Sequence, residues 1–168
     1  MIQEQMILDT LNELNIPYET ISHPPAFTVA ELKTFCDFDA SVCKNLFLYD
    51  KRTDIYYLVV MLEEKKAHSN TIRKQVKAAS LVFGEEDKLF ELLGVTPGSV
   101  SPLGIIFDKN KSIKLLIDED LPKHNLLGFH PNINTSTVII SYSDFEKFIK
   151  WHNNAYQFIC VTKEDIKE

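Results

Sequence analysis

The chain has 168 residues, of which 45% are hydrophobic and 25% charged, and its formal net charge is −6. This composition excludes a disordered chain and favours one globular domain, residues 1–168, with a core of its own. No apolar run approaches the roughly 20 residues of a membrane-spanning helix, and the negative charge weighs against indiscriminate nucleic-acid binding without excluding a local basic patch.

The cysteines and the first residues indicate the compartment. Cys36, Cys43 and Cys160 are odd in number and widely spaced, so neither a disulfide framework nor a zinc pattern fits them. The first 14 residues contain acids but no basic residue, which is not typical of a signal peptide. We therefore expect a cytoplasmic protein that does not act at a membrane. Nucleotide-loop, dinucleotide and metalloprotease motifs do not occur, and we expect no metal and no cofactor.

The apolar residues predict alternating helices and strands. From the N-terminus these are a helix over 2–14, a strand over 16–21, a helix from Thr28 to about 38 with Glu31 completing a capping box, and strands over 45–49 and 55–62 around a turn. A helix from Ser69 or Asn70 to about 76, a helix over 85–93 closed by Gly94, and strands over 105–107, 113–117 and 137–141 follow. The last elements are a helix over 142–151 and a strand over 156–161. The expected fold class is α/β (α+β), a single compact domain with a mixed, largely antiparallel sheet surrounded by helices.

The segment 96–104, TPGSVSPLG, is the first candidate site. Gly98 allows a ligand to approach the main chain, and Pro102 stiffens the loop and removes a donor. The small residues between them leave N–H groups that could point at a carbonyl or anionic oxygen. Local spacing alone favours a plain connector over such a site.

Two further segments carry polar groups beside apolar strands. Lys44 and Asn45 precede a run of apolar residues, where the lysine is either a cation beside a cavity or a side chain that extends to water. His130 lies in a Gly-Phe-His-Pro-Asn segment and is either a proton carrier or a turn residue, because no acid stands at a fixed offset from it. His23, ahead of two prolines, either borders a site or lies in a surface turn.

A run of cations without acids extends from residue 65 to residue 77. It is the best local phosphate-binding surface in an otherwise acidic chain, although a solvated helix face is the more frequent explanation of such a run. Its members are Lys65, Lys66, Arg73, Lys74 and Lys77.

Taken together and in this order, these segments resemble one family. The matching stretches are HPP at 23–25 with Thr28 and Glu31, CKNLFL at 43–48, GSVSPLG at 98–104, and FHPN at 129–132 with NTST at 134–137. The chain resembles the prolyl-tRNA editing family, which contains the YbaK proteins and prolyl-tRNA synthetase-associated domains. The sequence GSVSP is most similar to the corresponding loop of the free-standing deacylases that hydrolyse alanine mischarged onto proline tRNA.

The resemblance implies roles for the candidate residues. The catalytic group would be Lys44, Gly98, Ser99 and His130, with the loop amides stabilising the oxyanion and Lys44 holding phosphate or ribose oxygens. The substrate-binding group would be Asn45, Val100, Ser101, Pro102, Thr135 and His23. Apolar side chains near the loop, such as Val100 and Leu103, are candidates for the wall that excludes proline. The cations of the 65–77 run would contact tRNA. The residues do not identify a general base.

The resemblance also implies the activity and the partners. The expected function is trans-editing, in which Ala-tRNA(Pro) is hydrolysed to alanine and free tRNA(Pro). The partners would be the acceptor end of tRNA(Pro) and, transiently, prolyl-tRNA synthetase, and the protein would be a monomer. Two alternatives stay open: a deacylase for another amino acid, cysteine or serine, and a non-catalytic module that binds aminoacyl-tRNA or an amino acid.

Overall fold

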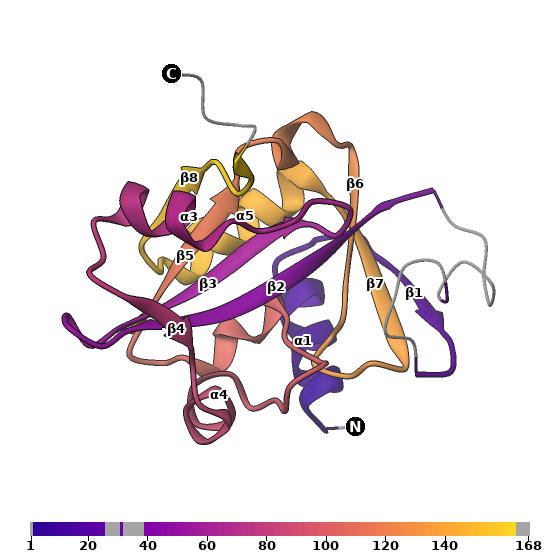
Figure 1. Ribbon diagram of the computed structural model, residues 1–168. Helices are drawn as coiled ribbons and strands as arrows, with labels where there is room; N and C mark the ends of the chain where they lie inside the picture. Colours follow the sequence, from indigo (N-terminus) through magenta and orange to yellow (C-terminus); the bar gives the residue numbers. More distant parts are fainter. Residues whose placement is uncertain (1, 26–30, 32–38, 164–168) are drawn as a thin grey trace.

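One mixed sheet runs through the protein, for which we use a computed structural model that describes residues 2–25, 31 and 39–163 (Figure 1). Seven strands follow the order β1-β7-β6-β2-β3-β5-β8, and β4 pairs with the edge of β2. Pairs β1–β7, β6–β7, β2–β3 and β2–β4 are antiparallel, and pairs β2–β6, β3–β5 and β5–β8 are parallel. The strands are β1 (Glu19–Ser22), β2 (Ser41–Asp50), β3 (Ile55–Leu62), β4 (Leu81–Phe83), β5 (Ile113–Asp118), β6 (Leu126–Phe129), β7 (Ser136–Ser141) and β8 (Tyr156–Ile159).

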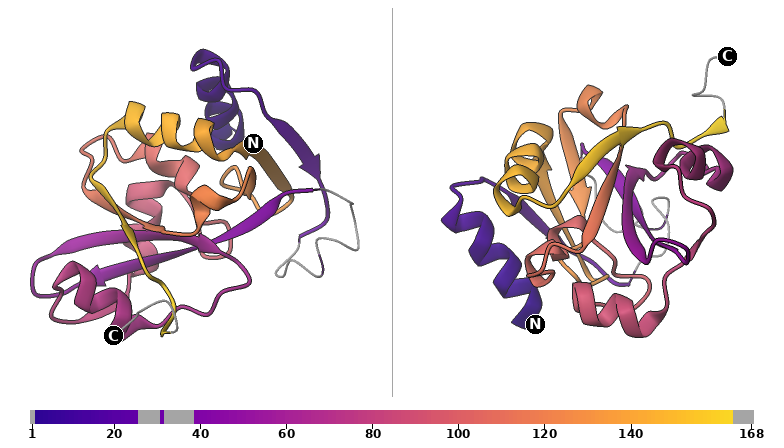
Figure 2. Two further views of the ribbon diagram at one scale, coloured as in Figure 1. Left: turned by 90° about the horizontal axis from the view of Figure 1, so that it is seen from above. Right: turned by 90° about the vertical axis from the view of Figure 1, so that its left-hand side faces the viewer.

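Helices cover both faces of this sheet. In the view from above, α1 and α5 lie on one side of the β2–β3 hairpin and α3 on the other (Figure 2). The α-helices are α1 (Ile2–Glu13), α3 (Ser69–Val76), α4 (Glu86–Leu93) and α5 (Tyr142–His152), with short 3-10 helices η1 (Pro102–Phe107) and η2 (Leu121–Lys123). Within the described ranges, no helix is both long enough and apolar enough to cross a membrane.

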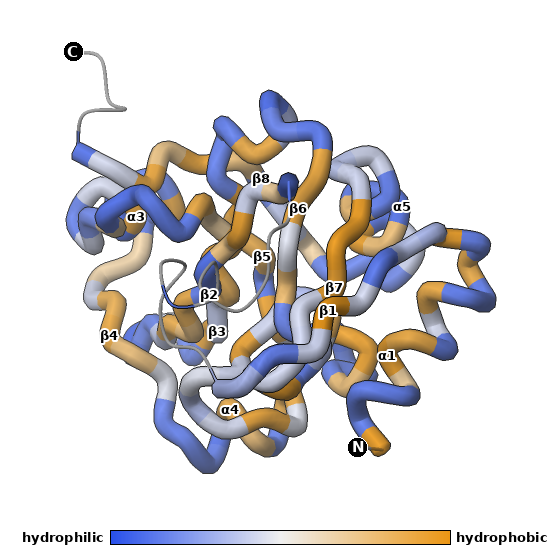
Figure 3. The backbone as a smooth tube through the Cα atoms, turned by 90° about the vertical axis from the view of Figure 1, so that its right-hand side faces the viewer, coloured by the Kyte–Doolittle hydropathy of each residue, from blue (hydrophilic) through white to orange (hydrophobic). Residues whose placement is uncertain are grey.

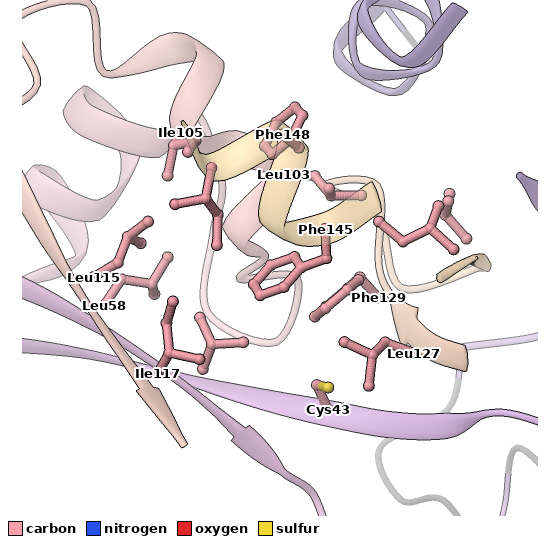
Figure 4. Packing of buried hydrophobic residues seen from close by; sticks show 14 of the residues in the cluster. Cys43, Leu58, Leu103, Ile105, Leu115, Ile117, Leu127, Phe129, Phe145 and Phe148 are labelled. Atoms are coloured by element: carbon pink, nitrogen blue, oxygen red, sulfur yellow. The ribbon is translucent and has the colours of Figure 1, made fainter. Parts of the chain in front are cut away.

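Two apolar clusters lie against opposite faces of the sheet. The larger cluster contains Cys43 and Phe47 of β2 together with residues of α1, α5 and η1. Its centre is the stack of Phe129 on Phe145, whose ring centroids are 5.0 Å apart (Figure 4). The smaller cluster contains Leu48 of β2 and Ile72 of α3. Because side chains alternate along a strand, consecutive residues of β2 serve the two clusters in turn.

The structure confirms most of the expected elements and the fold class. The strand predicted over 105–107 is wrong, because Ser101 caps and Pro102 begins the 3-10 helix η1 there. The first predicted strand lies later, at Glu19–Ser22, and β2 begins earlier, at Ser41. Strands β4 and β6 were not predicted. The N-cap of α3 is His68, not Ser69 or Asn70, since its ring accepts a hydrogen bond from Thr71 N. The helix predicted over 28–38 lies outside the described residues, except for Glu31.

The stack of Phe129 on Phe145 gives a test of the larger core. Phe145→Ala removes a fully buried ring, and we expect a loss of about 3–5 kcal/mol in the free energy of unfolding, measured by urea denaturation. Trp151→Ala, on the same helix but 48% exposed, is the control and should cost much less. Equal losses would contradict this description of the core.

Candidate functional site

The outer edge of β2 changes partner along its length. Ser41 and Val42 pair with β6, and β4 begins to pair only at Leu48. Between these two stretches, the Asn45 amide donates from Nδ2 to the carbonyl oxygen of Val100 at 3.0 Å. The loop 98–101 therefore lies beside β2 in the interval where no described strand pairs with this edge.

This loop offers backbone N–H groups. Gly98 has φ +96°, and a Cβ added there would meet no atom within 4 Å. Ser99 N donates to Thr96 O at 3.3 Å, and the chain then enters η1. Among the described residues, the amides of Gly98, Val100 and Ser101 have no hydrogen-bond acceptor. The loop thus combines an open glycine with main-chain donors, which is the composition of an oxyanion site.

Strand register assigns Lys44 to the face away from the larger core. Cys43 belongs to the larger core cluster, so alternation turns Val42 and Lys44 to the opposite face of β2. Leu127 of β6 is in the same cluster, and Gly128 faces the other way. A Cβ on Gly128 would be 3.6 Å from Val42 Cγ2. Lys44 is half-buried, and within the described part of the chain its ammonium has no hydrogen-bond or ion-pair partner.

Two histidines and a threonine lie on that face. His130 follows Gly128 by two residues, and its Nδ1 is 3.0 Å from the carbonyl oxygen of Ser136. Its ring centroid is 6.3 Å from that of His23, whose Nε2 is 2.9 Å from Thr137 Oγ1. We call the surface formed by Lys44, His130, His23 and Thr137 the polar face.

The partner of His130 fixes its tautomer. A carbonyl oxygen only accepts, so Nδ1 carries the proton and Nε2 of the neutral ring is an acceptor. Burial lowers the pKa of His130 below its usual value of 6.5, and the nearby His23 lowers it further, against the opposing effect of the Ser136 carbonyl. His130 is therefore neutral at pH 7, and the structure gives Nε2 no partner among the described residues.

His23 has both ring nitrogens engaged. Nδ1 donates to Pro24 O at 2.8 Å, which leaves Nε2 as acceptor of the Thr137 hydroxyl. The backbone N–H of His23 donates to Thr135 O. In this arrangement His23 supports the polar face from β1, and Thr135, half-buried, contributes its carbonyl.

Other predicted site residues lie inside the fold. Ser101 is fully buried, and its hydroxyl accepts from Leu103 N as the cap of η1. Pro102 is buried at the start of η1. Leu103 was a candidate for the pocket wall, and this prediction is wrong because its side chain is fully buried in the larger core. Val100 is half-buried beside Asn45. Burial, and secondarily the charge of Asp118, raises the pKa of the Cys43 thiol, so it stays protonated.

The cations of the 65–77 run do not share one environment. Lys65 forms ion pairs with Asp118 at 2.9 Å and Asp120 at 2.6 Å. Hydrogen bonds from Lys123 and then Lys65 lower the pKa of Asp120 to about 2. Arg73 donates to Asn70 and to the carbonyl of Ala78.

Three members of the run are exposed: Lys66, Lys74 and Lys77. The α3 segment is largely hydrophilic in Figure 3. Its buried Ile72 packs in the same cluster as Met61, which is the cross-strand partner of Lys44. These cations therefore lie on the same side of the sheet as the polar face.

Sequence reasoning missed two residues of this region. Thr137 was predicted only as the first residue of a strand and as part of the resemblance, and Asn132 only as part of the matching segment around His130. Asn132 adopts the αL conformation, with φ +61°. An Asn that follows His-Pro is typical of such a turn, and this sequence feature could have identified the residue. In the part of the chain that the structure describes, no group of three His, Cys, Asp or Glu side chains could hold a metal ion.

Comparison with known proteins assigns this architecture. The aminoacyl-tRNA editing domain model matches residues 23–148. The chain belongs to the aminoacyl-tRNA editing domain family. Prolyl-tRNA editing protein ProX of Acetoanaerobium sticklandii is 33% identical over 160 residues, which cover 95% of this chain and 98% of ProX. The prolyl-tRNA synthetase associated domain-containing protein 1 of Mus musculus is 32% identical over 145 residues, 83% of this chain and 85% of that protein.

The fold of the editing domain is also present among solved structures. A crystal structure described as a candidate trans-editing enzyme for prolyl tRNA synthetase matches with a TM-score of 0.70 at 14% identity, over 96% of this chain and 95% of that one. At this identity the likeness shows the fold. Membership of the family gives the enzyme class: the protein is an aminoacyl-tRNA deacylase, a hydrolase.

The half-buried, neutral His130 makes stability depend on pH. Because the folded-state pKa is lower than the unfolded-state value near 6.5, the unfolded chain binds the proton first as pH falls. The contribution of His130 to stability is therefore complete above about pH 6.5 and is lost as pH falls towards the folded-state pKa. We expect His130→Asn to lose less stability than the wild type between about pH 7.5 and 5.5, measured by urea denaturation; equal losses would contradict a lowered pKa.

Proposed function

We propose that the protein is a trans-editing deacylase that hydrolyses mischarged Ala-tRNA(Pro) after its release from the synthetase. The observation that carries the proposal is the polar face. Lys44, which has no partner among the described residues, shares one side of the sheet with the neutral His130, and Asn45 next to it holds a loop whose amides at 98, 100 and 101 have no described acceptor. The printed names of ProX and of the mouse relative support proline tRNA as the substrate class.

The reaction is ester hydrolysis. Water attacks the carbonyl carbon of the aminoacyl ester, negative charge develops on the carbonyl oxygen, and the bond to the ribose oxygen then breaks. The amides of Gly98, Val100 and Ser101 are the proposed donors to that oxygen, and a single donor of this kind contributes about 10²–10³ in rate. Main-chain donors on a loop held by Asn45 are oriented before the reaction begins.

His130 is the proposed acceptor for the proton of the attacking water. Its Nε2 is basic and without a described partner, while Nδ1 is fixed by the Ser136 carbonyl. The proton taken from water would leave with the ribose hydroxyl when the tetrahedral intermediate collapses. A base whose pKa is lowered from 6.5 is mainly deprotonated at pH 7, so the group is in the competent form.

Lys44 is the proposed contact to the phosphate or ribose of the terminal nucleotide. The half-buried Lys44 ammonium has no partner among the residues that the structure describes, and such a group is available to an anionic ligand. Discrimination between alanine and proline would be steric, because a difference of one methylene in binding gives only about 1–3 kcal/mol. Val100, half-buried at the loop, is the proposed wall of the pocket.

Lys44→Ala tests the assignment directly. We expect about a 100-fold lower single-turnover rate of alanine release from Ala-tRNA(Pro), because the lost contact between Lys44 and the terminal nucleotide no longer positions the ester. Lys44→Arg, which retains the charge, should recover part of the rate, and Lys109→Ala is the control, because Lys109 is an exposed lysine outside both the polar face and the proposed tRNA contact.

The same assay separates the competing functions. Release by the wild type at the spontaneous rate, with tRNA still bound, would favour a non-catalytic binding module. Faster release of cysteine or serine than of alanine from the same tRNA would replace the proposed cargo. The first outcome would contradict the proposed catalysis, and the second would contradict the proposed amino acid.

The exposed cations near α3 are the proposed contact to the acceptor stem. Lys66→Ala with Lys74→Ala should raise KM for aminoacyl-tRNA and lower the slope of log KM against log salt by about 0.7–0.9 for each phosphate that is no longer neutralised, with kcat unchanged. Lys51→Ala with Lys109→Ala, exposed lysines elsewhere, is the charge-matched control. An equal effect of both pairs would mean that only net charge matters.

A further inference from the structure

Asn132 joins the histidine segment to the two ends of the catalytic loop. Its Nδ2 donates to the carbonyl oxygen of Leu93, the last residue of α4, at 2.9 Å. On its other side, a Cβ added to Gly104 would be 2.8 Å from Asn132 Oδ1. Leu93 and Gly104 flank the segment that contains the loop. One buried amide therefore contacts the chain just before and just after the loop, and it lies two residues from His130.

Asn132 is costly to keep in this position. Only 7% of it is exposed, and its Oδ1 has no hydrogen-bond partner among the residues that the structure describes. A buried acceptor without a partner destabilises the folded state. Its backbone has φ +61°, a conformation that few residues other than Gly and Asn adopt readily. A buried polar atom kept without a partner is more typical of a functional site than of a core optimised for packing.

We infer that Asn132 is a positioning residue that sets the place of the 98–101 amides relative to His130. The inference rests on the proposed function, because it concerns the geometry between the proposed proton acceptor and the proposed oxyanion donors. Asn45 holds the loop from β2 through Val100 O, and Asn132 holds its ends from the segment after β6. The two side-chain amides hold the loop from β2 and from the segment after β6, so the distances from the loop to both segments are fixed. Asn132 itself touches no reacting atom.

The test is Asn132→Gly, which removes the amide and retains the backbone conformation. We expect kcat for deacylation to fall about 10- to 100-fold with KM for aminoacyl-tRNA within about twofold, because misplacement affects the transition state more than binding. Asn154→Ala is the matched control: Asn154 is 3% exposed and its Nδ2 bonds to Asp108 and Ile113 O, so it should lose stability but keep kcat.

Gly104→Ala provides the second arm. The added Cβ meets the Asn132 amide, so this change should also lower kcat, and the double variant with Asn132→Gly should be no worse than Gly104→Ala alone. Additive losses in the double variant, or a kcat for Asn132→Gly within about twofold of the wild type, would overturn the inference.

Amide hydrogen exchange separates this inference from the proposed function. Asn132→Gly should speed exchange at Ser99 and Gly104, whose amides donate to Thr96 O and Ser101 O, while Asn154→Ala leaves it unchanged, and this readout needs no activity. An inactive wild type would overturn the proposed function, and unchanged exchange in Asn132→Gly would overturn the positioning role.

Discussion

The free stretch on the outer edge of β2 determines where the loop can lie. A parallel partner, β6, occupies the start of that edge and an antiparallel partner, β4, occupies its end. Strands β6 and β4 run in opposite directions along β2, so one cannot extend into the other. The hydrogen-bonding edge of β2 between them is therefore left for another segment. In this interval the Asn45 side chain, on the larger-core face of β2, joins the loop before η1 to the strand through Val100 O. The place of the 98–101 loop thus depends on the sheet as well as on the glycines.

The same sheet separates packing from chemistry. Odd-numbered residues of β2, such as Cys43 and Phe47, face the larger core, whereas Lys44 faces away from it. Strand β6 repeats the division, with Phe129 stacked in the core and the following His130 on the polar face. Alternation with period two therefore allows each strand to contribute both to stability and to the site. A register shift of one residue in β2 would turn Lys44 into the core and expose the ring of Phe47. The packing of the core therefore fixes the position of the site residues.

Much of the fold could be predicted from local pattern, and the site could be predicted only in part. Helices α1 and α5 and the β2–β3 hairpin follow from apolar spacing, which is a local property. The η1 segment was predicted as a strand because Ile105, Ile106 and Phe107 are β-formers; the Ser-Pro start outweighed that propensity. Strand β6 is short and contains Gly128, so no periodic signal marks it.

The relation between Lys44 and His130 depends on pairing between residues far apart in the chain. No spacing rule connects position 44 to position 130, and the resemblance supplied the connection that local physics does not. The cationic run shows the opposite case. Sequence placed Lys65 among free cations, but Asp118 and Asp120 come from a distant segment and engage it. Long-range partners thus decide both which groups act together and which are already neutralised.

Acidic and basic residues are distributed unequally between helices α3 and α4, which bears on how a polyanionic substrate would approach the protein. Helix α4 begins with Glu86 and Asp87 and has no basic residue in its last turn, whereas α3 has no acid in its first turn and carries Arg73 and Lys74 in its last. The two helices lie at different parts of the sheet (Figure 1). In the proposed binding mode, a phosphate backbone would be repelled from the α4 side of the loop and attracted towards α3. A net charge of −6 is compatible with such contact to one end of a tRNA, and it disfavours binding along the whole molecule.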